Sequence, residues 1–342
     1  MTARSRRIGG GPMLVLLLLL LVVSVTAAVT IGPSDVGAAD VWRVVADHLG
    51  FASDATPTEN AIVWEIRLPR VLLAATVGAG LALVGAVMQA TMRNPLADPY
   101  LLGISAGASF GAVVVFVGLG GAAFGLTTGA FGGAMVAFAA VLVLGAGRAV
   151  RIEPGRIVLA GVAVASLFEA GTALLIIAAA DPQGTRGILY WLLGSLAGAT
   201  WSDLAIAVPV LAVVGAITLA QARPLNAMAI GDDDAGAVGV DVSRVRWLLL
   251  VTGALLTGAL VAVSGAIGFV GLLLPHATRL VVGRDHRFLL PAVALVGASF
   301  LVWVDTFART AFDPQEIPVG VATALIGAPA FAFLLARRMG RP

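Results

Sequence analysis

The segment VGAGLALVGAV, at Val77–Val87, returns in similar form 180 residues later as TGALVAVSGAI, at Thr257–Ile267. Both copies are apolar and contain glycine, as is typical of transmembrane helices that pack closely together. The same offset also aligns two prolines and two glycines beyond the apolar cores: Pro95 with Pro275, and Gly103 with Gly283. We interpret the two segments as equivalent helices of two internal repeats.

The composition places both copies in a membrane protein. Of the 342 residues, 59% are hydrophobic and 12% are charged, about half the charged fraction of a soluble domain. Apolar stretches of about 17 residues or more recur, and each can cross a hydrocarbon core of ~30 Å. We therefore predict an all-α polytopic membrane protein with about ten transmembrane helices, near residues 13–32, 68–90, 98–118, 126–146, 157–179, 200–220, 247–266, 268–282, 289–309 and 318–336.

The two copies lie five predicted spans apart, so they cross the membrane in opposite directions. This is the inverted internal repeat found in many transporters. We expect a single transmembrane domain over residues 1–342, with repeat halves at approximately 60–180 and 240–336. A long loop at residues 221–246 precedes the second half.

The arginines orient the chain in the membrane. All 21 basic residues are arginines. With the N-terminus in the cytoplasm, sixteen lie inside and five outside: Arg43, Arg67, Arg70, Arg186 and Arg309. This positive-inside bias predicts that both termini are cytoplasmic, and it accounts for the pI near 9.9 without a nucleic-acid partner. The basic N-terminus before the first apolar run also fits a signal peptide, but a retained first helix is the simpler interpretation.

Residues that the chain lacks exclude several kinds of chemistry. Without cysteine it has no disulfide and no thiolate metal site. Without lysine it has no standard Walker A motif, so ATP-driven transport would need ATP and Mg on a separate ATPase. The three histidines, His48, His276 and His286, do not occur at metal-binding spacing. We therefore expect a chain that is not an enzyme and binds no metal or cofactor.

Two polar sequences interrupt the apolar pattern. Arg93–Pro99, RNPLADP, contains two prolines, which end a helix, and Gln89 lies one turn earlier. This segment is either an ordinary cytoplasmic turn or a broken segment at membrane depth. Glu169 lies inside the fifth span, with Ser166 and Thr172 at helical spacing. An ionisable residue there either lines a transport pathway or hydrogen-bonds to a neighbouring helix.

The loop at residues 221–246 is the longest inside loop, and its centre, Gly231–Asp241, reads GDDDAGAVGVD. The three successive aspartates can cap the start of a short helix, and Gly239 can end it. Asp241 or Ser243 can then start another helix. The pattern favours two short amphipathic helices that form a docking surface. A solvated acidic loop is the alternative, whereas the ligand spacing of a calcium loop is missing.

Six sequences, in order, cover nearly the whole chain: RLPR at 67–70, GAxxQxxxRNPLADPYLLGISAGA at 85–108, LAGVA at 159–163, GDDDAGAVGVDV at 231–242, GAIGFVGLLLPHATRLVVGRDHR at 265–287 and IPVGVATALIGAPAFAFLL at 317–335. Together they resemble the FecCD family of permeases, which includes importers of cobalamin, haem and ferric siderophores. The resemblance implies a ten-helix permease subunit of a binding-protein-dependent ABC importer in the bacterial cytoplasmic membrane. It also implies a homodimer or close heterodimer, two cytoplasmic ATPase subunits and an extracytoplasmic substrate-binding protein.

The resemblance also implies roles for individual residues. Coupling to the ATPase falls on the loop, at Asp232, Asp233, Asp234, Ala235, Gly239, Val240 and Asp241. Docking of the binding protein falls on Arg67, Arg70 and Arg309, which could instead be interfacial anchors. A cytoplasmic gate falls on Asn94, Leu96, Pro154 and Gly155, although some members carry small hydroxyl residues at the last two positions.

The expected activity is ATP-driven alternating access. The expected cargo is an iron chelate, a ferric siderophore, because this is the commonest cargo of the family. Haem and cobalamin are the alternatives. An ion-coupled secondary transporter that uses Glu169 is a different class. It would explain the inverted repeat and the carboxyl group within a span, but not the acidic loop or the external arginines.

Overall fold

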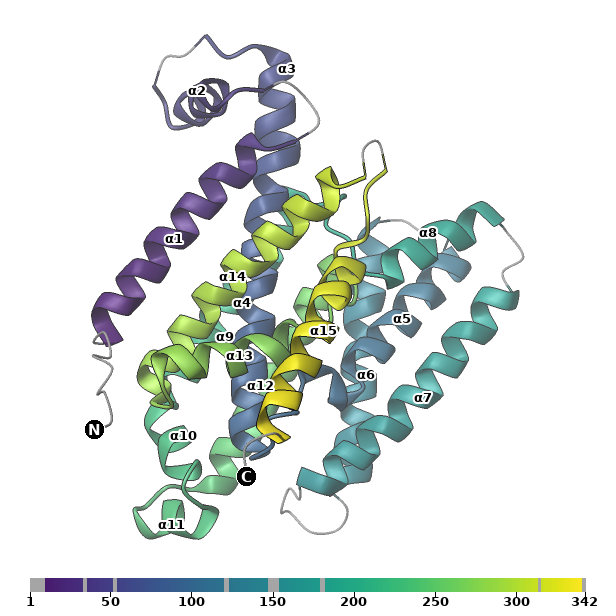
Figure 1. The fold of residues 1–342 in the computed structure, drawn as a ribbon. Helices are drawn as coiled ribbons and strands as arrows, with labels where there is room; N and C mark the ends of the chain where they lie inside the picture. The colour runs from purple at the N-terminus through teal and green to yellow at the C-terminus, as the bar shows by residue number, and fades with distance from the viewer. Residues whose placement is uncertain are drawn as a thin grey trace.

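The computed structural model describes residues 10–32, 36–51, 54–119, 123–146, 154–178, 182–312 and 315–339. Figure 1 shows an elongated bundle of helices. Within the described residues, seven helices are long and apolar enough to cross a membrane: α1 (Gly10–Thr30), α4 (Leu68–Thr91), α6 (Ala123–Ala146), α7 (Pro154–Ala178), α9 (Trp201–Ala220), α12 (Val242–Ser264) and α14 (His286–Thr310). Three more are apolar but shorter or shorter in their described part: α5 (Ile104–Leu119), α13 (Val270–Val282) and α15 (Val319–Met339).

Each predicted range overlaps one of these helices, so the all-α polytopic class is confirmed. The number that cross the membrane and the side on which the termini lie stay predictions. The remaining helices were mostly not predicted: α2 (Ala38–His48), α3 (Pro57–Asn60), the π-helix η1 (Ala61–Arg67), the 3₁₀-helix η2 (Pro99–Leu102), α8 (Pro182–Leu192), α10 (Ala222–Met228) and α11 (Asp232–Ala237).

The loop at residues 221–246 does contain two short helices, but their positions differ from the prediction. α10 and α11 both precede Gly239. The prediction placed the second helix after Gly239, starting at Asp241 or Ser243. In the structure Asp241 instead caps the long helix α12, where its side chain accepts a hydrogen bond from the Arg244 amide at 3.0 Å. An N-cap aspartate serves a long helix as well as a short one, so the sequence alone did not separate the two.

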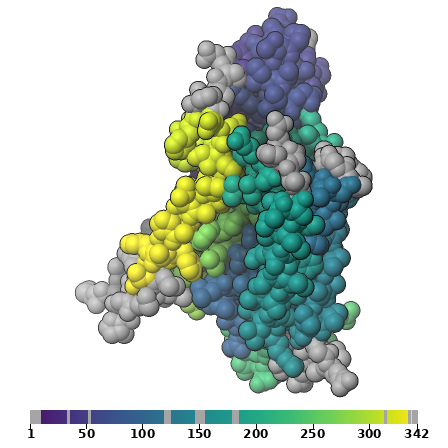
Figure 2. All heavy atoms as spheres, turned by 90° about the vertical axis from the view of Figure 1, so that its right-hand side faces the viewer, coloured from purple at the N-terminus to yellow at the C-terminus, as the bar shows by residue number. Residues whose placement is uncertain are grey.

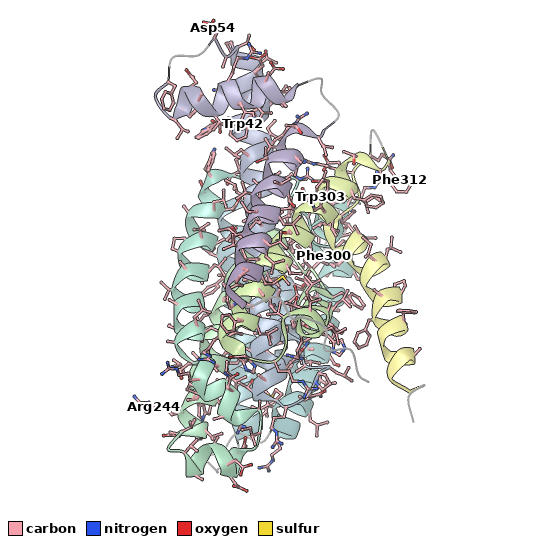
Figure 3. All side chains as sticks on the ribbon, turned by 60° about the vertical axis from the view of Figure 1, so that its left-hand side comes forward. Trp42, Asp54, Arg244, Phe300, Trp303 and Phe312 are labelled. Carbon is pink, nitrogen blue, oxygen red and sulfur yellow. The ribbon has the colours of Figure 1, made fainter. Side chains whose placement is uncertain are left out.

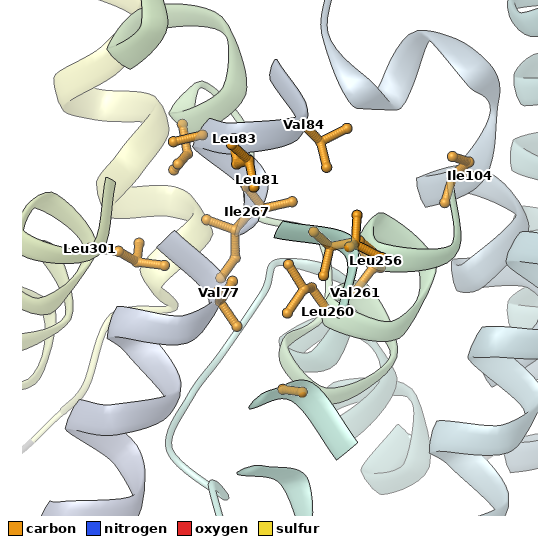
Figure 4. Close-up of a cluster of buried hydrophobic side chains, with 14 of the residues drawn as sticks. Val77, Leu81, Leu83, Val84, Ile104, Leu256, Leu260, Val261, Ile267 and Leu301 are labelled. Carbon is orange, nitrogen blue, oxygen red and sulfur yellow. The ribbon is translucent and has the colours of Figure 1, made fainter. Parts of the chain in front are cut away.

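The repeat segments lie together at the centre of the molecule. Figure 4 shows Val77 and Leu81 of α4 close to Leu260 and Val261 of α12, among the fully buried side chains. α4 is buried along nearly its whole length because other helices surround it. Its last residue, Thr91, accepts a hydrogen bond from Arg246 near the start of α12. The two helices therefore run in opposite directions, as an inverted repeat requires.

The packing around these two helices is approximately two-fold. α4 contacts α13 and α14, whereas α12 contacts α5 and α6. The pair α5 and α6 therefore takes the place in the first half that α13 and α14 take in the second. The proline match at the fixed offset does not follow this symmetry, because Pro95 lies in a turn and Pro275 lies inside α13. Gly103 and Gly283 both have positive φ, of 70° and 97°, but their ψ angles of 2° and −164° differ, so only Gly103 is in the left-handed helical region.

Glycines bring neighbouring helices into backbone contact. A Cβ atom at Gly78 in α4 would overlap the carbonyl of Gly297 in α14. A Cβ atom at Gly133 in α6 would overlap the carbonyl of Gly107 and approach Gly111 in α5. Lipid gives no hydrophobic force between helices, so close packing of small residues carries the association.

The outer helices expose apolar side chains along much of their length. The most exposed include Leu19, Val22 and Val23 of α1, Leu159, Leu167, Leu174 and Ile177 of α7, and Leu325 and Phe333 of α15. Figure 2 shows the face on which α7, in teal, and α15, in yellow, both lie. Apolar surface of this extent suits contact with hydrocarbon or with another apolar protein surface.

Candidate functional sites at the two ends of the bundle

A buried arginine attaches the acidic loop to the bundle. Nη2 of Arg246 lies 2.9 Å from Oδ2 of Asp232, the first residue of α11. Nε of the same arginine donates to the carbonyl of Thr91 at 3.3 Å. Because α4 ends at Thr91, just before the Arg93–Pro99 turn, Arg246 connects the loop directly to that turn. From the sequence, Arg246 was counted only as one of the sixteen cytoplasmic arginines. Its position next to the apolar residues that begin α12 could have indicated that it is buried.

α10 is attached to the start of α14. The Asn226 amide donates to Oδ1 of Asp285 at 2.8 Å, and its carbonyl oxygen accepts from the His286 backbone at 2.9 Å. Asp285 is the N-cap of α14 and pairs with Arg287 at 2.7 Å. Hydrogen bonds from Arg287 and Asn226 hold the pKa of the Asp285 carboxyl well below its usual range. This carboxylate therefore stays ionised at the end of the bundle that carries the loop.

Some of the predicted coupling residues hold the loop in place, and others are exposed on its surface. Ala235 is fully buried, and Gly239 has a positive φ of 86°, as suits the residue that ends a helix. The exposed members are Asp233, Asp234, Gly239 and Asp241, with Asp232 and Val240 intermediate. Two apolar residues beside them were missed, Ile230 and Val238, each 73% exposed. The loop therefore presents carboxylates and two apolar side chains to its surroundings.

The structure brings together the two segments of the predicted cytoplasmic gate. Asn94 and Gly155 line the same cavity, of about 420 Å³, which Leu159 also lines. Oδ1 of Asn94 accepts the amide of Leu96 at 2.9 Å, which fixes the turn, and Leu96 is exposed. Pro154 begins α7, but its side chain lies outside the described residues. The gating role of the four residues stays a prediction.

Glu169 lines a cavity of about 440 Å³ between α5, α7 and η2. The other polar lining residues are Tyr100, Ser105, Ser109 and Thr172. Thr172 was predicted to share the face of Glu169, whereas Ser166, also predicted, is exposed on α7. The Tyr100 hydroxyl is fixed by the backbone of Ile267, to whose carbonyl it donates at 2.9 Å. Both Glu169 and a set of hydroxyl groups therefore face one open space.

The three arginines predicted to dock the binding protein lie at the opposite end, and all are buried. Arg67, Arg70 and Arg309 are only 4%, 6% and 5% exposed. Arg67 donates to the carbonyls of Val29 and Thr30 at 3.2 Å, at the end of α1. Arg309 donates to the neighbouring carbonyl of Ala28. As placed, these guanidinium groups join helices within the chain and are not displayed on its surface.

Arg70 has the most extensive set of partners. Its Nε lies 3.0 Å from Oδ2 of Asp305 in α14, and its Nη1 lies 2.8 Å from Oε2 of Glu316. Asp305 is also buried, with its side chain 1% exposed. These two carboxylates were not predicted as partners of Arg70, because they are more than 230 residues away in the sequence; the docking role of Arg70 stays a prediction.

A bundle of apolar helices with a structured polar loop at one end is the architecture of a multi-pass membrane protein. The chain belongs to the FecCD transport family, whose model matches residues 18–337.

Relatives in this family agree on the kind of protein. The chain is 47% identical to the cobalamin import system permease protein of Halobacterium salinarum, over 82% of this chain and 75% of that protein. It is 42% identical to the hemin transport system permease protein of Yersinia pestis, over 83% and 86% of the two chains. A solved metal-chelate type ABC transporter in an inward-facing conformation aligns with a TM-score of 0.84 and 32% identity, over 96% and 99%.

These findings identify a multi-pass permease of a metal-chelate ABC importer in the cytoplasmic membrane. The relatives are permease subunits, so ATP hydrolysis belongs to a separate partner. The family resemblance read from the sequence is confirmed.

Proposed function

We propose that this permease imports an iron chelate, with a ferric siderophore as the first candidate. The observation that carries the proposal is the cavity beside Glu169, whose other polar groups are hydroxyls. Hydroxyl groups and one carboxylate can hydrogen-bond to the rim of a chelate, but they offer no set of strong ligands that would remove the iron. Haem and cobalamin remain the alternative cargoes, as in the two relatives named above.

The second permease subunit packs, in this proposal, on the face that carries α7 and α15. Both helices expose large apolar side chains there, and Glu169 lies on α7. A dimer formed through this face would place the cavity beside Glu169 between the subunits. The translocation path would then run along that interface, past Asn94 and Gly155 at its cytoplasmic end.

Two ATPase subunits, with ATP and Mg bound to them, would dock on α10 and α11. Exposed carboxylates and the side chains of Ile230 and Val238 provide a mixed polar and apolar surface of the kind that protein interfaces use. Movement of α11 would reach the end of α4 through Arg246, which contacts both Asp232 and Thr91. The same movement would reach α14 through Asn226.

Docking of a substrate-binding protein at the opposite end is also part of the proposal. Its contact with Arg67, Arg70 and Arg309 would require these side chains to exchange their internal partners for carboxylates of the binding protein. The buried positions of all three argue for a structural task in the resting permease.

The cargo is tested by ligand-dependent ATPase activity of the assembled complex with its binding protein. A ferric siderophore, haem and cobalamin are compared at equal concentration. Stimulation by the siderophore alone supports the proposal. Stimulation by haem or cobalamin alone would replace the cargo and keep the importer class.

One observation favours a second class of mechanism: the carboxyl of Glu169 faces an open cavity at the level of the spanning helices. In an ion-coupled transporter this group would carry a proton or bind sodium. The permease alone, with Glu169→Gln as its variant, distinguishes the two. Uptake driven by an ion gradient that the variant abolishes would establish the second class, and no gradient-driven uptake by either protein would exclude it.

A further inference from the structure

The helix α2, which the sequence did not predict, carries three different stripes. Val41, Val44 and His48 follow one side of the helix, on which both valines are buried and His48 stacks on Trp64 of η1. A second stripe, at Asp40, Arg43 and Asp47, is polar. The third stripe repeats every three or four residues and contains only apolar side chains: Ala38, Trp42, Ala46 and Leu49, the last just beyond the helix. Its two large members, Trp42 and Leu49, are 54% and 69% exposed.

The first stripe fixes the orientation of α2. The ring of His48 stacks on Trp64 at a centroid distance of 3.7 Å, and Trp64 lies 4.9 Å from Trp201 of α9. The indole nitrogen of Trp201 donates to the carbonyl of Trp64 at 3.0 Å. α2 is therefore held against the bundle, and the direction of its apolar stripe is set by these contacts.

The polar stripe is held in ion pairs within the chain. Arg43 pairs with Asp40 and, at 3.3 Å, with Glu59, which caps α3 together with Thr56. The Gly37 amide and Arg43 hold the pKa of Asp40 below its usual value, so this edge stays charged. A charged edge beside an apolar edge is the pattern of a helix that lies along a membrane surface.

The position of α2 identifies the surface that its apolar stripe meets. α1 ends at Thr30, and α2 begins at Ala38 and contacts α1. α1 itself exposes a continuous apolar surface to the surroundings. Figure 3 shows Trp42 on the side of α2 toward the spanning helices, whereas Asp54 lies at the far end of the molecule. Trp42 therefore lies on the side of α2 that faces the spanning helices, on an element that contacts α1.

We propose that α2 is an interfacial helix, whose stripe of Ala38, Trp42, Ala46 and Leu49 inserts into the headgroup boundary of the outer leaflet. Tryptophan is enriched at this boundary because its ring is apolar and its N–H group is polar. The stripe contains no charge, and it lies on a helix that contacts α1, whose own exposed side chains are apolar. The inserted helix would fix the height of the permease in the membrane and the tilt of α1.

The chain contains no cysteine, so a cysteine introduced at one position is the only thiol in the permease and can be labelled selectively. Leu49→Cys places a probe on the apolar stripe, and Asp47→Cys places the matched control two residues away on the polar stripe; both parent side chains are exposed, so neither variant leaves a core cavity. Each purified permease is labelled with the fluorophore NBD before its ATPase subunits are added, and the assembled complex is reconstituted in phosphatidylcholine vesicles with or without brominated acyl chains. Iodide is added on both sides as the aqueous quencher.

The NBD group at position 49 is expected to be quenched several-fold more by brominated lipid than the group at position 47, with the order reversed for iodide. Equal iodide quenching at both positions, with no quenching by brominated lipid, would overturn the proposal. If position 49 were protected from iodide only after the substrate-binding protein is added, the proposal would also be overturned. The stripe would then be a contact surface for that protein. Ala38→Cys, on the same stripe, repeats the measurement independently.

Discussion

Arg70 belongs to a buried charge cluster in which one arginine faces Asp305 and Glu316. Removing one partner of a buried ion pair leaves the other charge desolvated and unpaired, at a cost of about 3–5 kcal/mol. We therefore expect Arg70→Ala to lower the melting temperature of the purified permease in the absence of any binding protein. Asp305→Ala is expected to have a similar effect, and thermal unfolding in detergent measures both.

A double variant provides the control for this cluster. Arg70→Met combined with Asp305→Leu removes both charges, so it should recover part of the stability that either single change to alanine loses. An unchanged melting temperature for Arg70→Ala, together with lost affinity for the binding protein, would show that Arg70 serves docking alone.

Arg246 allows a test of how the loop communicates with the rest of the protein. Its pair with Asp232 and its hydrogen bond to Thr91 together contribute about 1–2 kcal/mol. We expect Arg246→Ala to lower uptake per ATP hydrolysed several-fold, because movement of α11 would then lose its direct contact with the end of α4. ATP hydrolysis by the complex should continue. Parallel measurement of uptake and phosphate release gives the ratio.

Arg244→Ala is the matched control for Arg246→Ala, because it removes an arginine two residues away whose side chain is exposed. Its uptake per ATP should equal that of the unmodified complex. If both variants reduced the ratio equally, the loss would reflect the positive charge of this region, and the connection through Thr91 would carry no signal.

Helix contacts in this protein depend on which face of a helix carries glycine, as two adjacent glycines of α6 show. Gly133 packs against the backbone of Gly107 and Gly111 in α5, whereas Gly132 has open space where a Cβ atom would lie. Gly133→Ala is expected to destabilise the permease by about 1–3 kcal/mol, the usual cost of overpacking. Gly132→Ala should be neutral or stabilising, because alanine favours a helix more than glycine does.

Thermal unfolding of the two glycine variants in the same detergent measures the difference. Both variants replace glycine with alanine in the same helix, so the gain in helix propensity is the same in each. The difference between their melting temperatures therefore reports the packing of α6 against α5. Equal melting temperatures would mean that α5 and α6 do not approach as closely as the structure places them.

Elements with strong apolar signals could be predicted from the sequence, and those fixed by distant contacts could not. α4 and α12 were predicted because an apolar helix is evident from its own residues. α2 was missed because its apolar residues are divided between two stripes, and only the stack of His48 on Trp64 shows which stripe faces inward. The burial of Arg70 was missed for the same reason, since its carboxylate partners come from the other half of the chain.

In the candidate sites, too, features evident from the local sequence were predicted, and contacts between distant segments were not. The family resemblance predicted the turn at Asn94 and the start of α7 at Gly155 as two parts of one gate, and in the structure both residues line one cavity. The acidic loop was predicted from its composition. Its attachment through Arg246 and Asn226 was not, because a hydrogen bond between segments leaves no periodic signal in the sequence.

At the scale of the whole molecule, the two ends of the bundle are joined by an antiparallel pair of central helices, α4 and α12. One end carries α10 and α11, and the other carries α2 and the buried arginine cluster. Arg246 connects α11 to α4, which runs through the core of the bundle to Arg70. A force applied to the loop by a partner therefore has a continuous path of packed helix to the opposite end, as alternating access requires.

This chain is expected to transport only when a separate ATPase acts on it. The most direct measurement is uptake of a ferric siderophore into vesicles that contain the purified permease, with its binding protein on the outside. Vesicles that also contain the ATPase subunits and ATP should accumulate the chelate, and vesicles without those subunits should not. Equal accumulation in both would contradict the account.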